Sequence, residues 1–353
     1  MNHSSGNRDA LVSVAVPVFN GQATVGQALQ SLLSQTYRNL EIIVVDDGST
    51  DGTWDVLQSF GSSIRAIRQA NGGLAAARNA GLQAATGEFI ALMDADDLCE
   101  PDRIAAQVQF LRQCPELSLC CSDFGAFSAE GQVSHSHIAA YYSRCNLAEG
   151  GVAARFPHRG SIDLRNCLPR RLENAAEVPI YFGAAYEDIS LGNFVHPPTV
   201  MFRRSLIKEV GSFDLEAKTM CDWDWLVRVA RVSAIGFIDR PLLQYRLSAS
   251  QMSATEFSGI DSLLVARRIC ERDPTLIARW PKRFRQRFGR LSASVADSLA
   301  DKRPLQAASL LTASIFRYRT WTRQTPRTLF KILAPEQLVR LLRRYRTGKL
   351  HST

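Results

Sequence analysis

Asp94 and Asp96 are separated by a single residue, and this spacing makes them the side chains best placed to bind a divalent cation. In an extended turn, side chains two positions apart point the same way, so both can share one ion. Hard oxygen ligands of this kind favour Mg²⁺ or Mn²⁺. A D-x-D triplet by itself is common as a solvated turn, but this one follows the apolar segment 87–93 and precedes a helix expected from Pro101. The context therefore indicates a cation site at the end of a strand.

Two further polar clusters could contact a nucleotide. The first is the DDGS string at 46–49, where a carboxylate could accept from a base N–H or a ribose hydroxyl and Gly48 permits a tight turn. The second is the NGG string at 71–73, followed by Arg78, which could neutralise a diphosphate. The alternative for each cluster is an ordinary turn or helix start.

Strands and helices alternate through the first 125 residues, and this pattern decides where the polar clusters lie. Continuous apolar runs predict strands at 11–19, 40–45, 64–68, 88–93 and 117–122. Helical spacing is present around 28–33 and at 52–60, 74–85 and 101–113. The alternation predicts a mostly parallel sheet, in which ligands bind beyond the carboxyl ends of the strands. Each polar cluster follows a strand, so we expect the clusters to converge at one edge.

The remainder of the chain is less regular. Residues 128–193 mix glycine, proline and short apolar pieces, and we expect an elaborated loop region over the site. Ordered segments then follow at 196–202 and from 204, with a helix at 222–232 and strand-like pieces at 234–238 and 242–246. From about residue 257 onward the pattern is helical and is interrupted by prolines.

The positive charge is concentrated in the last hundred residues. The net charge is +8, but residues 255–353 carry 21 Lys and Arg against 7 Asp and Glu, whereas residues 1–254 carry 21 against 27. An acidic main part argues against nucleic acid as a partner, because that affinity grows with the phosphates neutralised. Near the end, arginines alternate with an i, i+3, i+4, i+7 apolar stripe at Leu338, Leu341, Leu342 and Tyr345. This basic amphipathic helix could pack on the protein or lie on an anionic membrane.

The expected compartment is a reducing one. Eight cysteines occur without a CxxC pair or a zinc-like spacing, which favours buried thiols in the cytoplasm. Residues 1–10 lack the apolar core of a secretion signal, and no run approaches the roughly 18 to 20 apolar residues that span a bilayer. We expect a cytoplasmic protein, peripheral on the inner face of the cell membrane.

Six strings in a fixed order provide the most specific signal. They are VSVAVPVFN, LLSQTYRNLEIIVVDDGSTDGT, NGGLAAARNAG, GEFIALMDADDLCEPDRI, GSFD and CDWDWLVR. Over residues 11–250, with a gap at about 130–193, the chain resembles the family 2 glycosyltransferases, inverting enzymes of the GT-A fold that use nucleotide-activated sugars. The resemblance implies an α/β fold with a GT-A-type Rossmann-like mixed, mostly parallel sheet flanked by helices, and a C-terminal α-helical extension.

The resemblance also implies a domain plan. Residues 1–10 would be a flexible N-terminus and residues 11–254 the GT-A domain, with a nucleotide-sugar half at 11–125 and an acceptor half at 126–254. Residues 255–353 would form the basic helical region.

The activity implied by the resemblance is metal-dependent, inverting transfer of a sugar from a nucleotide-diphosphate sugar, UDP-sugars being favoured. The acceptor would be a hydroxyl of a saccharide or lipid-linked saccharide in surface polysaccharide assembly. Asp222 would be the catalytic base, and Asp96 with Asp94 would hold Mg²⁺ or Mn²⁺. The implied nucleotide-sugar-binding residues are Pro17, Phe19, Asn20, Asp47, Asn71, Arg78, Asp94, Ala95 and Arg246.

The chain departs from the family pattern at two positions. The family often has an acidic pair at the base position, and here Cys221 replaces its first member, which leaves Asp222 and, as second candidate, Asp224. Asp222 has the family's spacing to Arg228. In the later loop that begins at Tyr245, Ser248 stands where histidine is common.

Other enzyme classes fit the sequence less well. The G-x-G-x-x-G fingerprint of dinucleotide-dependent oxidoreductases is missing after the first strand, and there is no G-x-x-x-x-G-K-[ST] loop. A nucleotidyltransferase would share the carboxylates and the metal, but a glycine-rich basic opening loop is missing. A non-catalytic nucleotide-sugar-binding relative is disfavoured because both Asp96 and Asp222 are present.

Overall fold

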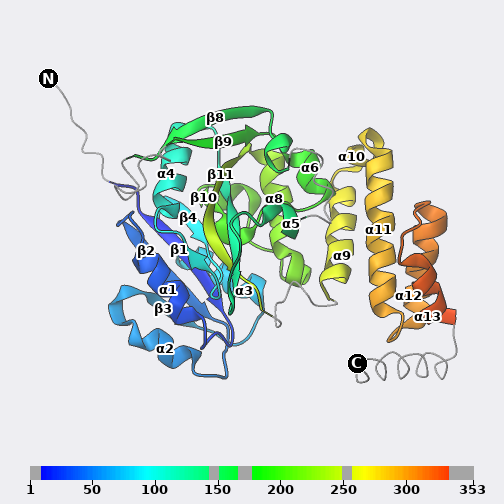
Figure 1. Ribbon diagram of the computed structural model, residues 1–353, viewed down its shortest axis with the longest axis horizontal. Coiled ribbons are helices and arrows are strands. Elements are labelled where there is room, and N and C mark those ends of the chain that lie inside the picture. Colours follow the sequence, from blue (N-terminus) through cyan, green and yellow to red (C-terminus); the bar gives the residue numbers. More distant parts are fainter. Residues whose placement is uncertain (1–8, 143–150, 166–176, 249–256, 334–353) are drawn as a thin grey trace. The chain divides into compact units, whose positions relative to one another are not determined.

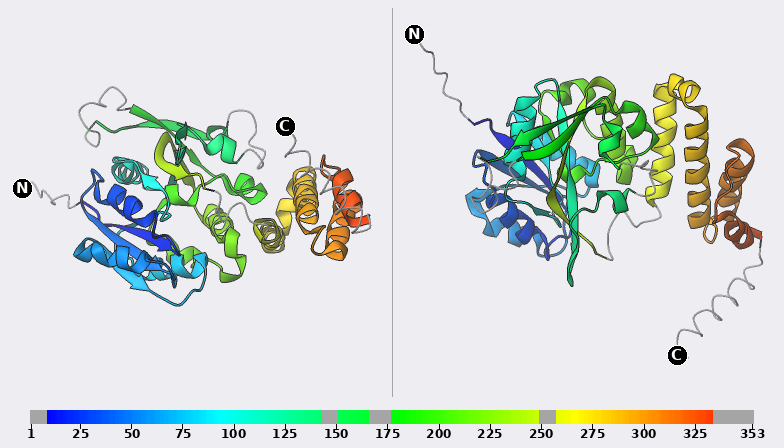
Figure 2. Two further views of the ribbon diagram at one scale, coloured as in Figure 1. Left: turned by 60° about the horizontal axis from the view of Figure 1, so that its bottom comes forward. Right: turned by 45° about the horizontal axis from the view of Figure 1, so that its top comes forward.

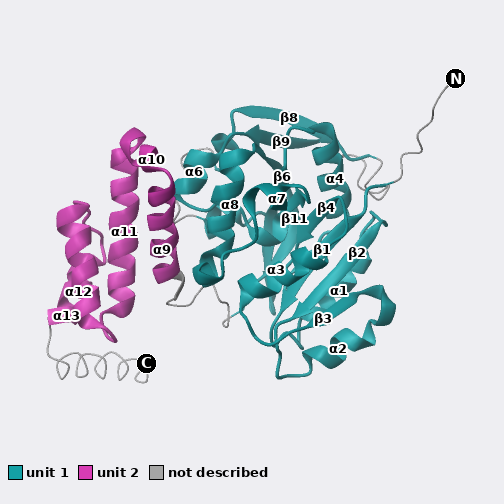
Figure 3. Cartoon of the chain, turned by 180° about the vertical axis from the view of Figure 1, so that it is seen from behind, with its two compact units in different colours: residues 1–251 teal, residues 252–353 magenta. Residues whose placement is uncertain are grey.

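The computed structural model describes residues 9–142, 151–165, 177–248 and 257–333. The chain divides into two compact units, residues 1–251 and 252–353, which are coloured separately in Figure 3. Each unit is described by itself below.

The first unit is built on an 11-stranded sheet flanked by helices (Figures 1 and 2). Its strands are β1 Val12–Val18, β2 Leu40–Asp46, β3 Arg65–Arg68, β4 Phe89–Leu92, β5 Leu98–Cys99, β6 Leu119–Ser128, β7 Gly131–Ser134, β8 His158–Asp163, β9 Glu177–Gly183, β10 Met201–Arg203 and β11 Ile235–Arg246. Its helices are α1 Val25–Leu33, α2 Thr53–Ser59, α3 Leu74–Ala84, α4 Arg103–Gln113, α5 Ile138–Tyr141, α6 Tyr186–Leu191, α7 Leu206–Val210 and α8 Cys221–Val232.

Strand order explains how the polar clusters come together. The order is β3-β2-β1-β4-β10-β6-β11-β9-β8, with β5 paired to β11 and β7 to β6. β1 pairs in parallel with both β2 and β4, so Val12 lies opposite Leu40 on one side and Phe89 on the other. All seven residues of β1 are buried, as its continuous apolar run requires of a central parallel strand. The carboxyl ends of β1, β2 and β4 therefore meet at one edge.

The predicted fold class is confirmed: a mixed sheet is flanked by helices, and further helices follow it in the chain. Parallel pairing dominates the half formed by β3, β2, β1 and β4. β10 then enters antiparallel between β4 and β6, and β6 pairs in parallel with β11.

The expectation that 128–193 is an irregular loop region is wrong for much of its described part. β7 pairs with β6, and β8 pairs with β9, which in turn pairs with β11. β8 reads HRGSID and is largely exposed, so it has no apolar run to reveal it. Its hydrogen bonds to β9 make it a strand, and this pairing is invisible in local periodicity.

The second unit is helical. Its helices are α9 Phe257–Arg272, α10 Pro274–Arg279, α11 Pro281–Leu299, α12 Pro304–Thr312, a π-helix Ala313–Arg317 and α13 Thr325–Leu333. Prolines open α10, α11 and α12 because the first helical N–H needs no partner within the helix. The core of this unit consists of small and aliphatic side chains, namely Ala293, Val295, Ala296, Leu299, Ala300, Ala307 and Leu311.

Two expectations about the membrane concern this region. The predicted amphipathic helix at 338–345 lies outside the described residues. Among the residues that the structure does describe, no helix is both long and apolar enough to cross a membrane.

Candidate active site

The loops that follow β1 and β2 are hydrogen-bonded to each other. The Asn20 N–H donates to Ser49 Oγ at 2.8 Å, and the Thr50 N–H donates to Asn20 Oδ1 at 2.9 Å. Asn20 has φ of 50°, a left-handed conformation that asparagine tolerates better than most residues. Phe19 and Asn20 are exposed, and Pro17 lies within β1 opposite Val45. This edge of the sheet therefore presents Phe19 and Asn20 to solvent.

Asp47 fastens the loop after β3 to the end of β2. Its buried carboxylate accepts the Gly72 N–H at 2.9 Å and the Gly73 N–H at 2.8 Å, and Gln69 Nε2 donates to it at 2.7 Å. Gly48 has φ of +78°, and a Cβ there would lie 2.8 Å from the backbone N of Asn71. Only glycine fits this close approach. Asn71 is thereby held beside the β2 loop, exposed to solvent.

The D-x-D turn after β4 is tied to α3 by a buried arginine. Arg78 Nη2 lies 3.1 Å from Asp94 Oδ1, and the Arg78 side chain is 3% exposed against 32% for Asp94. The same guanidinium lies 3.9 Å from Cys221 Sγ and over the Phe213 ring at 5.7 Å. Ala95 is buried between its two acidic neighbours. Arg78 thus links the turn after β4 to the start of α8.

Asp222 lies in the first turn of α8, near Arg78 and Asp94. Burial raises the pKa of its carboxyl, the Arg78 charge lowers it, and Asp94 raises it further. Asn193 Nδ2 donates to Asp222 Oδ2 at 3.0 Å, which orients the carboxylate. Sequence reasoning missed Asn193, because it lies at the end of the region expected to be irregular. The result is a carboxylate with a raised pKa, oriented by a neutral donor.

Asp224 is placed differently although it is only two residues away. It is fully buried, and Arg228 Nε lies 3.0 Å from its Oδ2. Arg228 also donates to the carbonyl oxygens of Val210 and Ser212. Asp224 therefore helps to hold α8 against the segment after α7, and Asp222 remains the better candidate for a base.

Arg246, at the end of β11, contacts the turn that carries Asp96. Its N–H donates to Asp97 Oδ1 at 3.0 Å, and its Nε donates to the Asp96 carbonyl at 2.7 Å. Its Nη2 donates to Gln27 Oε1 at 2.7 Å, and its guanidinium stacks 4.5 Å from the Phe127 ring centre. Arg246 thus positions the acidic turn. Ser248 lies two residues beyond it, just past the strand.

The acidic turn has the charge expected of a cation site. Burial and the Asp94 charge raise the pKa of Asp96 to about 6. Burial, with the charges of Asp96 and Asp94, raises the pKa of Asp97 well above its usual value, and Asp97 Oδ2 has no hydrogen-bond partner. A divalent cation would relieve this accumulation of negative charge, so Asp94 and Asp96 fit Mg²⁺ or Mn²⁺ by charge and ligand type. The described residues contain no cluster of three or more metal-ligating side chains, so most ligands would come from substrate and water.

Two buried residues near the end of β4 were not among the predicted site residues. Arg103 is fully buried and donates to the Leu92 carbonyl at 2.8 Å, which supports the end of the strand. His196 is buried and stacks 4.2 Å from the Phe124 ring, and neither of its ring nitrogens has a hydrogen-bond partner. Burial and the charge of Arg78 lower the pKa of His196 to about 3, so its ring is neutral at pH 7.

Comparison with known families decides the assignment. Residues 13–211 match the family model described as glycosyl transferase family 2, and this segment is more than half of the chain. The chain belongs to glycosyl transferase family 2.

Individual relatives of this glycosyltransferase agree with the family match. An uncharacterized glycosyltransferase of Rickettsia prowazekii is 27% identical over 251 residues, which cover 71% of this chain and 68% of the relative. The Escherichia coli UDP-Glc:alpha-D-GlcNAc-diphosphoundecaprenol beta-1,3-glucosyltransferase WfaP is 34% identical over 150 residues, 39% of this chain and 58% of WfaP.

Solved structures show the same fold. The mannosyltransferase PcManGT from Pyrobaculum calidifontis, solved in complex with GDP-Man and Mn²⁺, aligns with a TM-score of 0.53 at 19% sequence identity. The alignment covers 92% of this chain and 86% of PcManGT. At this identity the likeness concerns the fold alone.

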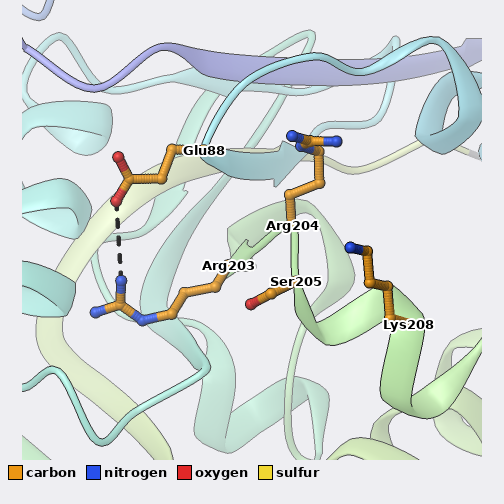
Figure 4. A pocket seen from close by; sticks show the side chains of 5 residues that line it. All are labelled: Glu88, Arg203, Arg204, Ser205 and Lys208. Atoms are coloured by element: carbon orange, nitrogen blue, oxygen red, sulfur yellow. Dashed lines mark ion pairs between the residues drawn. The ribbon is translucent and has the colours of Figure 1, made fainter.

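A pocket of this glycosyltransferase lies away from the acidic turn. It is lined by Glu88, Arg203, Arg204, Ser205 and Lys208 (Figure 4). Glu88 immediately precedes β4, whereas Asp94 follows its other end, so the pocket is at the opposite edge of the sheet. Arg203 Nη1 lies 4.0 Å from Glu88 Oε1. The pocket is therefore separate from the candidate active site.

We expect His196→Phe to reduce the pH dependence of stability in mild acid. The folded pKa is depressed to about 3 from an unfolded value near 6.5, so below about pH 6 the unfolded chain binds a proton that the folded chain excludes. Through this histidine the wild type loses up to about 1.4 kcal/mol of unfolding free energy per pH unit. Urea unfolding of both proteins at pH 7.5 and 5 measures the difference. Equal losses in the two proteins would contradict a buried neutral histidine.

Proposed function

We propose that this family 2 glycosyltransferase moves a sugar from a nucleoside-diphosphate sugar to an acceptor hydroxyl, with inversion at the anomeric carbon. The observation that carries the proposal is the group formed by Arg78, Asp94 and Asp222, which come from α3, the turn after β4 and the start of α8. A base, a buried cation and an acidic turn at one sheet edge are the parts that such a displacement needs.

Asp222 would remove the proton from the acceptor hydroxyl. The hydroxyl oxygen forms the new bond to the anomeric carbon, and the bond from that carbon to the donor phosphate oxygen breaks. The electron pair leaves with the nucleoside diphosphate, and the proton ends on Asp222. Asn193 donates to one carboxylate oxygen at 3.0 Å and so fixes the orientation of the base.

Arg78 would keep Asp222 ionised before the reaction. Its positive charge opposes the effect of burial on the Asp222 pKa, and Asp94 and Asp222 in turn raise the pKa of Arg78. A permanently charged guanidinium beside the departing diphosphate also stabilises the developing negative charge.

The donor would lie along the exposed edge between β1, β2 and β4. Phe19, Asn20 and Asn71 are solvent-accessible there and could contact the base and ribose, while Pro17 and Asp47 support the loops. Asp94 and Asp96 would hold Mg²⁺ or Mn²⁺, which when bound supplies positive charge to the diphosphate.

The acceptor and the donor nucleotide are proposed from chemistry and likeness together. The name of WfaP specifies UDP-Glc and a diphosphoundecaprenol-linked acceptor, which supports a UDP-sugar donor and a lipid-linked saccharide acceptor here. PcManGT binds GDP-Man, so a donor panel should contain both nucleotides. A lipid-linked acceptor of surface polysaccharide assembly lies in the membrane, so an enzyme that uses it would act at the cytoplasmic face of the membrane.

The experiment that tests this function measures released nucleoside diphosphate from a panel of UDP- and GDP-sugars, with Mn²⁺ and with a chelator. Turnover of one donor that needs the metal supports the proposal. Absence of turnover and of donor binding across the panel, with folded protein, would overturn it.

Asp96→Ala should weaken donor binding only when Mn²⁺ is present. Loss of a group that merely orients a metal ligand costs roughly 10- to 100-fold in affinity, so loss of a ligand should raise the donor Kd at least that much. Calorimetric titration of the donor with Mn²⁺ and with chelator measures this. Asp55→Ala, which removes an exposed carboxylate from α2, is the matched control. An unchanged Kd in Mn²⁺ would exclude Asp96 as a ligand.

A further inference from the structure

The second unit exposes large apolar side chains within a short segment. Between residues 316 and 333, Phe316 is 76% exposed, Trp321 63%, Phe330 46% and Leu333 76%. Single exposed apolar residues are normal on a protein surface, whereas several in one segment mark an interaction site.

α13 carries exposed apolar side chains beside its inward face. Its inward residues, spaced i, i+3, i+4 and i+7, are Thr325, Thr328, Leu329 and Ile332. Its exposed residues include Pro326, Phe330 and Leu333, spaced i, i+4 and i+7. A surface helix normally carries polar residues outside its inward face, so packing against α11 does not explain this exposed apolar stripe.

Hydrogen bonds and an ion pair hold the inward face of α13 against α11, so the apolar stripe stays exposed. Thr328 Oγ1 donates to Asp297 Oδ1 at 2.9 Å, and Lys331 Nζ lies 3.0 Å from the same oxygen. Ahead of it, Ser314 Oγ of the π-helix donates to the Gly289 carbonyl of α11 at 2.9 Å. Phe330 and Leu333 therefore cannot turn inward without breaking these bonds.

The segment that carries these apolar side chains is rich in basic residues. Residues 302–335 contain seven Lys and Arg and no Asp or Glu. Between residues 316 and 333, four exposed arginines alternate with the apolar residues, namely Arg317, Arg319, Arg323 and Arg327. Tryptophan and phenylalanine beside arginines suit the interface of a bilayer, where the rings enter the headgroup region and the guanidinium groups meet lipid phosphates.

We propose that residues 316–333 form a membrane-binding surface for an anionic lipid bilayer. Trp321 and Phe330 enter the interfacial layer, and the four arginines contact the lipid headgroups. The occupant is assigned by charge: Lys331 is paired with Asp297, but the four exposed arginines give this segment a positive charge that repels a second copy and attracts an anionic surface. This surface belongs to the second unit and does not depend on the donor chemistry at the acidic turn.

Flotation of the full chain with vesicles tests this surface. One set contains 30% phosphatidylglycerol in phosphatidylcholine, and the other contains phosphatidylcholine alone. We expect binding to the anionic set at low salt and its loss at high salt. The double variant Trp321→Ser/Phe330→Ser should lower the partition coefficient by roughly ten-fold or more. Arg319→Gln/Arg323→Gln should lower it by roughly five-fold for each arginine removed.

The matched control is Val133→Ser/Val232→Ser, which removes two apolar side chains, each 53% exposed, from the first unit. It should leave partitioning unchanged. Because all substituted side chains are exposed, thermal unfolding should be unchanged in every variant, and donor turnover without vesicles should equal that of the wild type. If the wild type showed no donor turnover, that result would contradict the proposed function and would leave the proposed membrane-binding surface unaffected.

Three results would overturn the proposal that residues 316–333 bind a membrane. The first is that the wild type does not bind anionic vesicles. The second is equal binding by the aromatic double variant and the control, with binding instead lost in Arg340→Gln/Arg343→Gln/Arg344→Gln. The third is that the wild type is a dimer without vesicle affinity and Trp321→Ser/Phe330→Ser is a monomer, which would assign the apolar stripe to a second copy of the chain.

Discussion

Asp222→Asn is expected to lower kcat for sugar transfer by on the order of 10²- to 10⁴-fold, the usual contribution of a general base. Asparagine has nearly the same shape and can still accept the Asn193 hydrogen bond seen at 3.0 Å, so the fold and the donor affinity should change little. Initial rates with saturating donor, together with the donor Kd, separate the two effects. Wild-type turnover in this variant would show that another group is the base.

The pH profile gives a second measure of Asp222. Burial raises its pKa above the ordinary value for aspartate of about 3.9. The base must be ionised, so kcat/KM should rise with pH through this raised pKa and reach its plateau above it. In Asp222→Asn the residual rate should not follow this titration.

Asp224→Asn is the comparison for Asp222. It removes the charge that faces Arg228 at 3.0 Å inside the first unit. Breaking a fully buried ion pair costs about 3–5 kcal/mol, and the cost is lower here because the Arg228 side chain is 23% exposed. Thermal and urea unfolding should therefore show a less stable protein, while the kcat of the folded fraction stays within a few-fold of the wild type. A large loss of kcat without a loss of stability would reverse the two assignments.

Arg78→Met should reduce kcat by on the order of 10²- to 10³-fold, as loss of a fixed electrostatic group at a developing anion does. Methionine fills part of the volume but leaves Asp94 and Asp222 without their shared cation. Since Arg78 lowers the Asp222 pKa, its removal should move the acidic limb of the kcat/KM profile to higher pH. Steady-state kinetics between pH 5 and 9 measures both effects.

Arg78→Lys is the matched control for that substitution. Lysine keeps the positive charge but cannot span Asp94 and Cys221 with two N–H groups as the guanidinium does. The pH profile should stay close to that of the wild type, with an intermediate kcat. If Arg78→Met left the pH profile unchanged, the proposed coupling between Arg78 and Asp222 would be wrong.

The first half of the sheet was predictable because its signals are local. The apolar runs of β1, β2 and β4 predict buried parallel strands, and the polar residues directly after them must then lie at the carboxyl edge. Charge is equally a property of the sequence, so the basic region after residue 254 could be found by counting.

The antiparallel part of the sheet could not be predicted from local sequence patterns. β8 has little apolar character because it is largely exposed, and its pairing with β9 holds it in the sheet. Asn193 ends the segment 128–193 that was expected to be irregular, and His196 opens the next segment without any local sign of its burial. Their burial and hydrogen bonds depend on elements that pack against them from elsewhere in the chain.

The sequence by itself identified the candidate residues: the D-x-D turn, the arginine of α3 and the two aspartates of CDWDWLVR. It also showed which of these residue types could bind a metal or act as a base. The choice between Asp222 and Asp224 was decided by tertiary structure. Residues two apart on a helix point in very different directions, so only one can face Arg78. Asp224 pairs with Arg228, one turn along its own helix, whereas Asp222 lies near an arginine more than 140 residues earlier. Helical periodicity shows that the Asp222 and Asp224 side chains point in different directions. Which of them faces the candidate active site is decided by the packing of α8 against α3 and the turn after β4.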